Sequence, residues 1–167
     1  MVSNNVTRLL DNRNINYKAY QLPKNKLGAE EVAQLLDAAP DIVFKSIVVT
    51  RRGPGKPILA VVPGNKEVDL KALARAVGEK KVTPATQREA EDLTHLQAGG
   101  ISPLALINQG FEILIDRSAL DHPLIHISGG ERGLNIRMAG EDLIQLTGGK
   151  TAPICQVKSS FDHYQGL

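Results

Sequence analysis

The sequence has few of the residues on which several common kinds of site depend. It contains one cysteine, no tryptophan, three tyrosines and three phenylalanines among its 167 residues. One cysteine can form neither a disulfide framework nor a zinc site built from several thiolates. So few rings also disfavour the aromatic platforms that stack bases in RNA-recognition and single-strand-binding domains. The core must therefore be built from aliphatic side chains.

Long apolar runs and a strong charge excess are missing as well. No run approaches the roughly 20 apolar residues of a membrane span. The first residues lack the basic and apolar segments of a secretory signal. The formal net charge is +2, which permits an anionic partner without requiring one. We therefore expect a cytoplasmic protein with no membrane partner, a compartment in which a lone unpaired cysteine is common.

Length and periodicity predict one domain of mixed structure. A chain of 167 residues with 42% hydrophobic residues fits a single globular domain, which we place over residues 1–157. Residues 158–167 have no periodicity and are expected to form a frayed tail. Strand and helix patterns alternate irregularly, and several strand-to-strand connections are too short for a helical crossover. The sequence therefore predicts an α+β (mixed α/β) fold, with a curved or barrel-like mixed sheet flanked by helices.

The individual elements follow from apolar spacing and from turn residues. Helical spacing predicts helices over residues 6–13, 32–39, 70–77, 86–93 and 141–146. Period-two patterns predict strands over residues 15–22, 43–50, 57–63, 81–83, 111–115, 124–128 and 134–138. Ser3 or Asn4 is expected to cap the first helix and Asp69 the third, which Gly78 should end. Residues 51–56 are expected to form a hairpin turn.

Two features that resemble reactive sites are better explained otherwise. His122 and His126 are four residues apart, but Pro123 and the strand-like residues around it oppose the helix that would bring both rings to one metal. No further ligand pattern follows, so we expect no metal site. Cys155 has no cationic neighbour in the sequence that would lower its pKa, which favours a buried, inert thiol over a nucleophile. No serine occupies a Gly-x-Ser-x-Gly motif.

Lys45 is the most informative single residue. In the strand over residues 43–49, alternation places Lys45 on the face that also carries Val43, Ile47 and Val49. A cation on an apolar face is costly unless it is paired or used in a site. The alternative is a frayed strand end from which the lysine extends to solvent. The spacing alone leaves both interpretations open.

Two glycine-rich segments could approach a ligand closely. Gly99-Gly100-Ile101-Ser102-Pro103 could bring backbone N–H groups near a ligand oxygen, although a plain surface turn is the commoner outcome for such a segment. Residues 127–134 contain three glycines between two strands, and Ser128 at the strand end could point into a pocket. An ordinary hairpin with a glycine-dependent turn explains the second segment equally well.

Together these segments resemble a known family. Val-Phe-Lys-Ser-Ile-Val-Val at 43–49, Gly-Gly-Ile-Ser-Pro at 99–103 and Ile-Ser-Gly-Gly-Glu-Arg-Gly-Leu at 127–134 resemble motifs of the YbaK/EbsC family of aminoacyl-tRNA editing domains. That family is related to the editing insertion of bacterial prolyl-tRNA synthetases. The resemblance extends from about Val6 to about Thr151. More narrowly, the chain is similar to the Cys-tRNA(Pro) deacylase branch in its length, in Tyr20 and in the Gly-Gly-Ile-Ser-Pro motif.

The resemblance implies an editing pocket, a substrate and a set of site residues. The substrate would be mischarged Cys-tRNA(Pro), with Cys-tRNA(Cys) as a further candidate, and prolyl-tRNA synthetase is a candidate partner. No cofactor and no metal are implied. Lys45 would be the catalytic cation. The implied substrate-binding residues are Tyr20, Gly99, Gly100, Ile101, Ser102, Pro103, Ser128, Gly129 and Asn135. Asn135 stands where the family's deacylases often carry aspartate, so it lacks a charge that could hold the substrate's ammonium group.

The implied chemistry needs no protein nucleophile. An aminoacyl ester is already reactive, so positioning and support for the developing negative charge can suffice. In this branch the resemblance implies that the cysteinyl thiol attacks its own carbonyl, closing a thiolactone and expelling the tRNA. One alternative is an Ala-tRNA(Pro) deacylase of the same fold that uses water. Another, from a different class, is a non-catalytic module that binds aminoacyl-tRNA or a synthetase.

Overall fold

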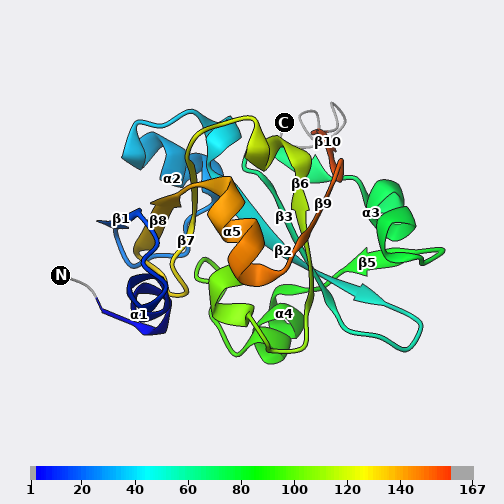
Figure 1. Ribbon diagram of the computed structural model, residues 1–167. Helices are drawn as coiled ribbons and strands as arrows, with labels where there is room; N and C mark the ends of the chain where they lie inside the picture. The colour runs from blue at the N-terminus through cyan, green and yellow to red at the C-terminus, as the bar shows by residue number, and fades with distance from the viewer. Residues whose placement is uncertain (1–2, 159–167) are drawn as a thin grey trace.

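The central feature is a mixed sheet with an apolar core on each of its two faces. Within residues 3–158, which this computed structural model describes, five strands form it in the order β5-β2-β3-β6-β9 (Figure 1). The β2–β3 and β2–β5 pairs are antiparallel, and the β3–β6 and β6–β9 pairs are parallel. The strands are β2 (Phe44–Arg51), β3 (Ile58–Pro63), β5 (Val82–Pro84), β6 (Glu112–Asp116) and β9 (Lys150–Ala152).

Strand β3 is buried on both faces because a separate apolar cluster covers each one. Leu59 and Val61 belong to the larger cluster, while Ile58, Ala60 and Val62 belong to the smaller one. The sequence of such a strand is a continuous apolar run, without the alternation of polar and apolar residues seen in half-buried strands. The two expected strands around residues 51–56 do form an antiparallel hairpin, as predicted.

A second, antiparallel sheet of three strands lies at the amino-terminal end of the molecule. Its order is β1-β8-β7, so β1 is an edge strand. One face packs into the larger core through Ile125, Ile127, Ile136 and Met138, all essentially buried. The strands are β1 (Tyr17–Gln21), β7 (Ile125–Ser128) and β8 (Leu134–Met138), and a two-stranded ladder joins β4 (Lys66–Val68) to β10 (Cys155–Val157).

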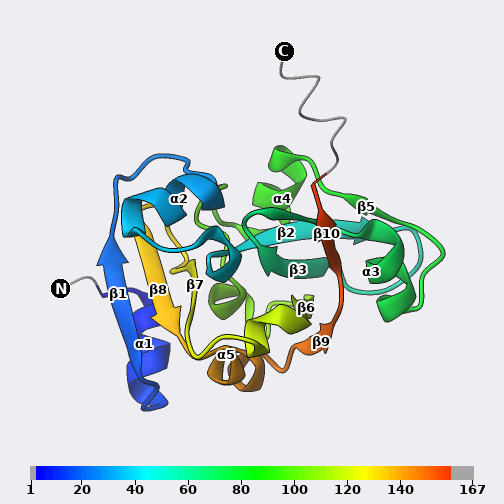
Figure 2. The ribbon, with the colours of Figure 1, turned by 90° about the horizontal axis from the view of Figure 1, so that it is seen from above.

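Helices cover these sheets and are capped largely as the sequence predicts. Helices α1 and α2 lie on opposite sides of the three-stranded sheet (Figures 1 and 2). Asn4 caps α1 by accepting a hydrogen bond from the Thr7 amide, and Asp69 caps α3. Gly78 ends α3 in the left-handed conformation, with φ of 75°. The α-helices are α1 (Asn5–Asn12), α2 (Ala29–Leu36), α3 (Leu70–Val77), α4 (Gln87–Thr94) and α5 (Gly140–Thr147), and the 3-10 helices are η1 (Pro40–Ile42), η2 (Pro103–Leu106) and η3 (Arg117–Leu120).

The mixed α/β class is as expected, and the barrel-like sheet is not confirmed. Across residues 3–158 the strands form three separate sheets, and none of them closes on itself. The strands β4, β9 and β10 have three residues each and were not predicted, whereas β5, which is equally short, was expected over residues 81–83. Of the expected tail, Lys158 forms an ion pair with Glu30, and residues 159–167 lie outside the described part of the chain.

Candidate functional site

A cavity of about 270 Å³ lies beside α2, where strand β2 meets the ends of β7 and β8. Its lining residues come from four segments, within residues 22–32, 43–47, 98–101 and 128–135, and not every residue of these ranges reaches the cavity. The three segments that carry the family resemblance therefore converge on it. The predicted site residues that line the cavity are Lys45, Gly99, Ile101, Ser128 and Asn135. Sequence reasoning missed the contribution of residues 27–29 at the start of α2, because the site motifs lie elsewhere.

Lys45 is half-buried at the edge of this cavity. It shares the face of β2 with Ile47 and Val49, as alternation predicts, and its Nζ donates a hydrogen bond to the carbonyl of Gly64 at 3.3 Å. Burial lowers its pKa, the charge of Lys158 lowers it further, and the carboxylates of Glu30 and Glu67 oppose the shift in part. No carboxylate in the described residues forms an ion pair with it. The lysine is therefore a partly desolvated cation held by a backbone oxygen.

The carbonyl that accepts this hydrogen bond belongs to Gly64, which the sequence analysis did not identify as a site residue. A Cβ at Gly64 would lie 2.7 Å from the Cβ of Ala29 and 2.8 Å from the carbonyl oxygen of Val43. The Gly64 amide donates to the same Val43 carbonyl at 2.8 Å. Only a residue without a side chain lets the β3–β4 turn approach the start of α2 so closely. The Pro63-Gly64 pair indicates a turn, but nothing in the sequence shows that this turn meets Lys45.

The two glycine-rich segments pack against each other and form one wall. Arg132 donates a hydrogen bond from Nε to the Ala98 carbonyl at 2.7 Å. Gly99 has φ of 92°, which favours glycine, and it lines the cavity. The contact between segments 98–101 and 128–135 was not evident from sequence, since more than 25 residues separate them.

Gly100 makes a close contact with the second glycine-rich segment. Its amide already donates to the Gln97 carbonyl at 2.8 Å, and it does not line the cavity. A Cβ there would lie 2.9 Å from the Glu131 backbone. The absence of a side chain therefore lets the two glycine-rich segments pack together, and the role of Gly100 in substrate binding stays a prediction.

Three other predicted residues support the wall without lining the cavity. Ser102 is fully buried, and its hydroxyl caps η2 by accepting from the Leu104 amide at 3.2 Å. Pro103 is buried at the first position of the same helix. The Gly129 amide donates to the Leu134 carbonyl, and a Cβ at Gly129 would lie 2.5 Å from the Leu134 side chain. These residues shape the segments that carry Ile101 and Ser128.

Asn135 contacts a histidine that the sequence suggested only as an unsatisfactory metal ligand. Its Oδ1 lies 2.8 Å from Nδ1 of His126, and each side chain is 5% exposed. Burial lowers the pKa of His126, the hydrogen bond to Asn135 opposes this, and Arg137 lowers it further. The ring of Tyr20 lies 5.5 Å from the imidazole, and Tyr20 stands opposite Asn135 across β1 and β8. Tyr20 is therefore next to the cavity, not on its wall.

The remaining reactive side chains lie away from this cavity. Cys155 is on β10, and burial together with the nearby Asp116 raises its pKa to about 11, which makes it a poor nucleophile. His122 lies 3.9 Å from Asp41, whereas His126 contacts a different partner. Across residues 3–158, no three His, Cys, Asp or Glu side chains are grouped as metal ligands would be. None of the described helices has the length and apolarity to cross a bilayer.

The fold and this cavity define an aminoacyl-tRNA editing domain. The chain belongs to the aminoacyl-tRNA editing domain family, whose model matches residues 24–146. It is 36% identical over 152 residues to an Enterococcus faecalis protein named "Putative Cys-tRNA(Pro)/Cys-tRNA(Cys) deacylase EbsC", covering 90% of this chain and 92% of that protein. It is 25% identical to a proline–tRNA ligase of Streptococcus equi subsp. equi over 133 residues, which are 74% of this chain and 21% of the ligase.

Solved structures agree with this assignment. One titled "Crystal structure of a putative trans-editing enzyme for prolyl tRNA synthetase" has a TM-score of 0.76 and 26% identity, covering 93% of this chain and 99% of that one. A hypothetical protein with a TM-score of 0.82 and 23% identity covers 90% of this chain and 99% of its own, and it shows the shared fold alone.

Proposed function

We propose that this protein is a trans-acting deacylase that removes cysteine from mischarged Cys-tRNA(Pro), with the substrate's own thiol as the nucleophile. Family membership supports an editing activity on aminoacyl-tRNA. The Enterococcus faecalis relative, whose name specifies cysteinyl-tRNA, supports the choice of amino acid. The prolyl-tRNA ligase match supports tRNA(Pro) as the nucleic acid, with the synthetase as a candidate partner.

The proposed mechanism is supported mainly by the composition of the cavity wall. Among the residues that the structure describes, Lys45 is the only ionisable side chain on that wall, whose other polar side chains are serines and asparagines. A serine hydroxyl without an adjacent base is a weak nucleophile at neutral pH. A reaction at this wall is therefore best served by a substrate that brings its own nucleophile, which a cysteinyl ester does.

The size of the cavity fits a small aminoacyl group. Its volume of about 270 Å³ falls below the range of roughly 300–1,000 Å³ found for sites of drug-sized ligands. Apolar side chains such as Leu27, Val32 and Phe44 would contact the substrate side chain, and Gly99 and Ile101 would form the opposite wall. Ser128 and Asn135 would offer hydrogen bonds at its polar end.

In the proposed step the substrate sulfur forms a bond to its own carbonyl carbon, and the ester bond to the terminal ribose breaks. The thiol proton is transferred to solvent, and the departing ribose oxygen takes up a proton. The products are a cyclic thiolactone and free tRNA, and water hydrolyses the thiolactone later. Lys45 would stabilise the negative charge that develops on the carbonyl and ribose oxygens, an effect that is strong in a partly desolvated site.

The direct test is deacylation of tRNA(Pro) charged with cysteine, alanine or proline, with Lys45→Ala as the matched inactive control. We expect rapid loss of cysteine, little loss of alanine or proline, and a rate with Lys45→Ala close to the uncatalysed rate. Preferential loss of alanine would instead favour the water-dependent alternative. Binding of all three RNAs without release of any amino acid would indicate a non-catalytic module.

A further inference from the structure

The face of the three-stranded sheet opposite the apolar core carries polar side chains beside the cavity, of which Asn135 and His126 are buried. Alternation and register place two rows of side chains on it. The row next to the cavity is Tyr20, Asn135 and Ser128, and the next row is Lys18, Arg137 and His126. Because alternate residues of a strand are about 6.8 Å apart, the second row lies about that distance from the row next to the cavity.

Lys18 and Arg137 form a like-charged pair on this surface. They stand directly opposite each other across β1 and β8, an arrangement that destabilises a sheet. Neither forms an ion pair with a carboxylate within residues 3–158. Both approach one ring, since Nζ of Lys18 lies 5.1 Å and Cζ of Arg137 5.9 Å from the centroid of Tyr20. The ring therefore lies near two cations, neither of which has an ion-pair partner within the described residues.

We propose that Lys18 and Arg137 bind the phosphodiester backbone of the RNA strand whose aminoacylated 3′ end enters the cavity. This inference rests on the proposed function, because it names the contacts that the nucleic-acid part of the substrate makes. A phosphate between the two cations would convert their repulsion into two attractive contacts. Arginine is suited to phosphate oxygens by its planar array of donors.

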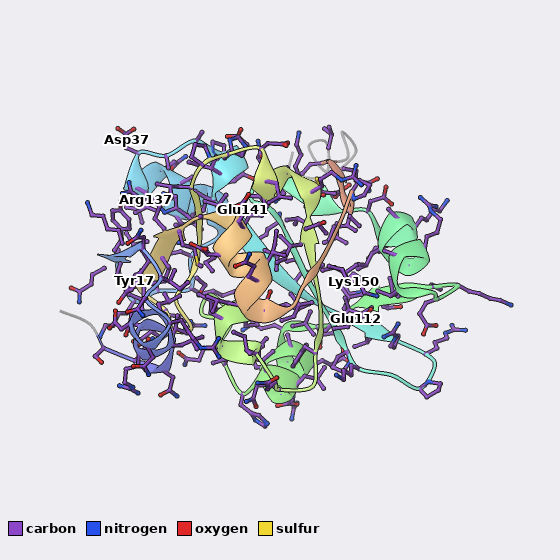
Figure 3. All side chains as sticks on the ribbon, in the orientation of Figure 1. Tyr17, Asp37, Glu112, Arg137, Glu141 and Lys150 are labelled. Carbon is purple, nitrogen blue, oxygen red and sulfur yellow. The ribbon has the colours of Figure 1, made fainter. Side chains whose placement is uncertain are left out.

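The position of the pair favours a nucleic acid over an acidic protein. Asn135 and Ser128 line the cavity, and the Lys18–Arg137 row follows directly on the same sheet face, so a strand leaving the cavity along this face crosses both cations. Strand β1 is at the sheet edge, and Lys18 on it is exposed to solvent. Arg137 lies at the β1–β8 end of the molecule, away from Glu112 and Lys150 in Figure 3.

The test compares a substrate that has phosphates with one that has none. The variant Lys18→Gln/Arg137→Gln and the charge-matched control Lys71→Gln/Lys150→Gln are assayed on Cys-tRNA(Pro) and on the cysteinyl ester of adenosine. Lys71 and Lys150 are exposed cations outside the cavity wall, so the control loses the same net charge at other surfaces.

For the Lys18/Arg137 variant we expect kcat/KM on Cys-tRNA(Pro) to fall at least tenfold at low salt. The slope of log kcat/KM against log salt should decrease by about 0.7, because the one phosphate held between the two cations is no longer neutralised. Its activity on the adenosine ester should stay within twofold of wild type, and the control should match wild type on both substrates. A wild-type salt slope in the Lys18/Arg137 variant would overturn the proposal, as would an equal loss on both substrates.

Direct binding keeps this proposal separate from the proposed function. Fluorescence anisotropy with an uncharged RNA hairpin ending in CCA measures affinity without any chemical step. If wild type cleaved neither ester, the proposed function would fail. The phosphate contacts would still be supported by salt-dependent binding that the Lys18/Arg137 variant loses, and they would be refuted if both proteins bound alike. Thermal unfolding at or above the wild-type temperature would show that the variant is folded, because the change removes a repulsion.

Discussion

The Nδ1 atom of His126 lies 2.8 Å from Oδ1 of Asn135, and the two side chains are buried together beside the cavity. A neutral imidazole that donates from Nδ1 holds the asparagine carbonyl and leaves the amide NH₂ for other partners. Because burial lowers the pKa of His126, this neutral form is favoured in the folded protein. Asn135 therefore presents a fixed hydrogen-bond donor where an aspartate would present a negative charge.

Asn135→Asp should raise the pKa of His126 above its wild-type value. A carboxylate at 2.8 Å favours the charged imidazolium, and this attraction opposes the desolvation that now lowers the pKa. The measurement is an NMR titration of the four histidines in both proteins. An unchanged His126 titration would mean that the two side chains do not interact in solution.

The same pair makes stability depend on pH. The folded-state pKa of His126 lies below its unfolded value near 6.5, so its contribution is fully present above about pH 6.5 and is lost as pH falls through the folded-state pKa. Urea unfolding between pH 7.5 and pH 5 should show this decline in wild type. His126→Gln should flatten it, and an equally steep decline in that variant would assign the effect to other groups.

Lys45→Met should give a folded protein that is more stable than wild type and inactive. The folded state disfavours the ammonium group, since burial lowers its pKa, so removing the charge relieves a cost that is present at neutral pH. A gain of roughly 1 kcal/mol would raise the melting temperature by about 2–4 °C. The gain should shrink as pH rises past the folded-state pKa of Lys45, because the wild-type lysine then loses its proton. A less stable variant would show that the bond to Gly64 outweighs desolvation.

Gly100→Ala should reduce stability and activity together. The new Cβ would meet the Glu131 backbone at 2.9 Å, and overpacking of this kind costs roughly 1–3 kcal/mol. Gly110→Ala is a suitable control, because nothing lies within 4 Å of its added Cβ and only its φ of 81° is unfavourable. Chemical denaturation and single-turnover rates measure the two effects. Lost activity with unchanged stability would place Gly100 in direct contact with the substrate.

Arg51 should contribute to stability and not to RNA binding. Arg51 stands at the start of the hairpin turn, but its side chain is only 8% exposed and pairs with Glu79 at 3.1 Å and Glu112 at 2.9 Å. Arg51→Gln should cost roughly 1–3 kcal/mol in urea unfolding through the lost charged hydrogen bonds. The salt dependence of RNA binding should be unchanged, and a reduced slope would contradict this assignment.

Local sequence patterns predicted most of the helices and strands. The elements that were not predicted depend on contacts between residues far apart in the chain. The caps Asn4 and Asp69, the stop at Gly78 and the period-two strands depend on neighbouring residues, so they could be predicted from sequence. The short strands β9 and β10 form because β6 and β4, which are distant in the sequence, pair with them, and no local pattern indicates such pairing. Sheet closure likewise depends on tertiary arrangement, and the barrel expectation was not confirmed.

The candidate site was predicted in part for the same reason. Alternation placed Lys45 on the correct face of β2, and the glycine motifs indicated two segments of the wall. Periodicity gives no information about partners far away in the chain, so neither the Gly64 carbonyl nor the His126–Asn135 pair was foreseen. Nor could sequence show that Gly100 packs against the Glu131 backbone.

The role of the substrate's sulfur is tested most directly by comparing cysteinyl-tRNA(Pro) with seryl-tRNA(Pro) in single-turnover reactions, with early products identified by mass spectrometry. The two esters have nearly the same shape, but a hydroxyl is a much weaker nucleophile at neutral pH than a partly ionised thiol. The proposed mechanism predicts far faster loss of cysteine, a thiolactone as the first product, and substantial activity in Cys155→Ser, Ser102→Ala and Ser128→Ala. Equal rates for the two esters, with free amino acid as the only early product, would contradict it and indicate attack by water.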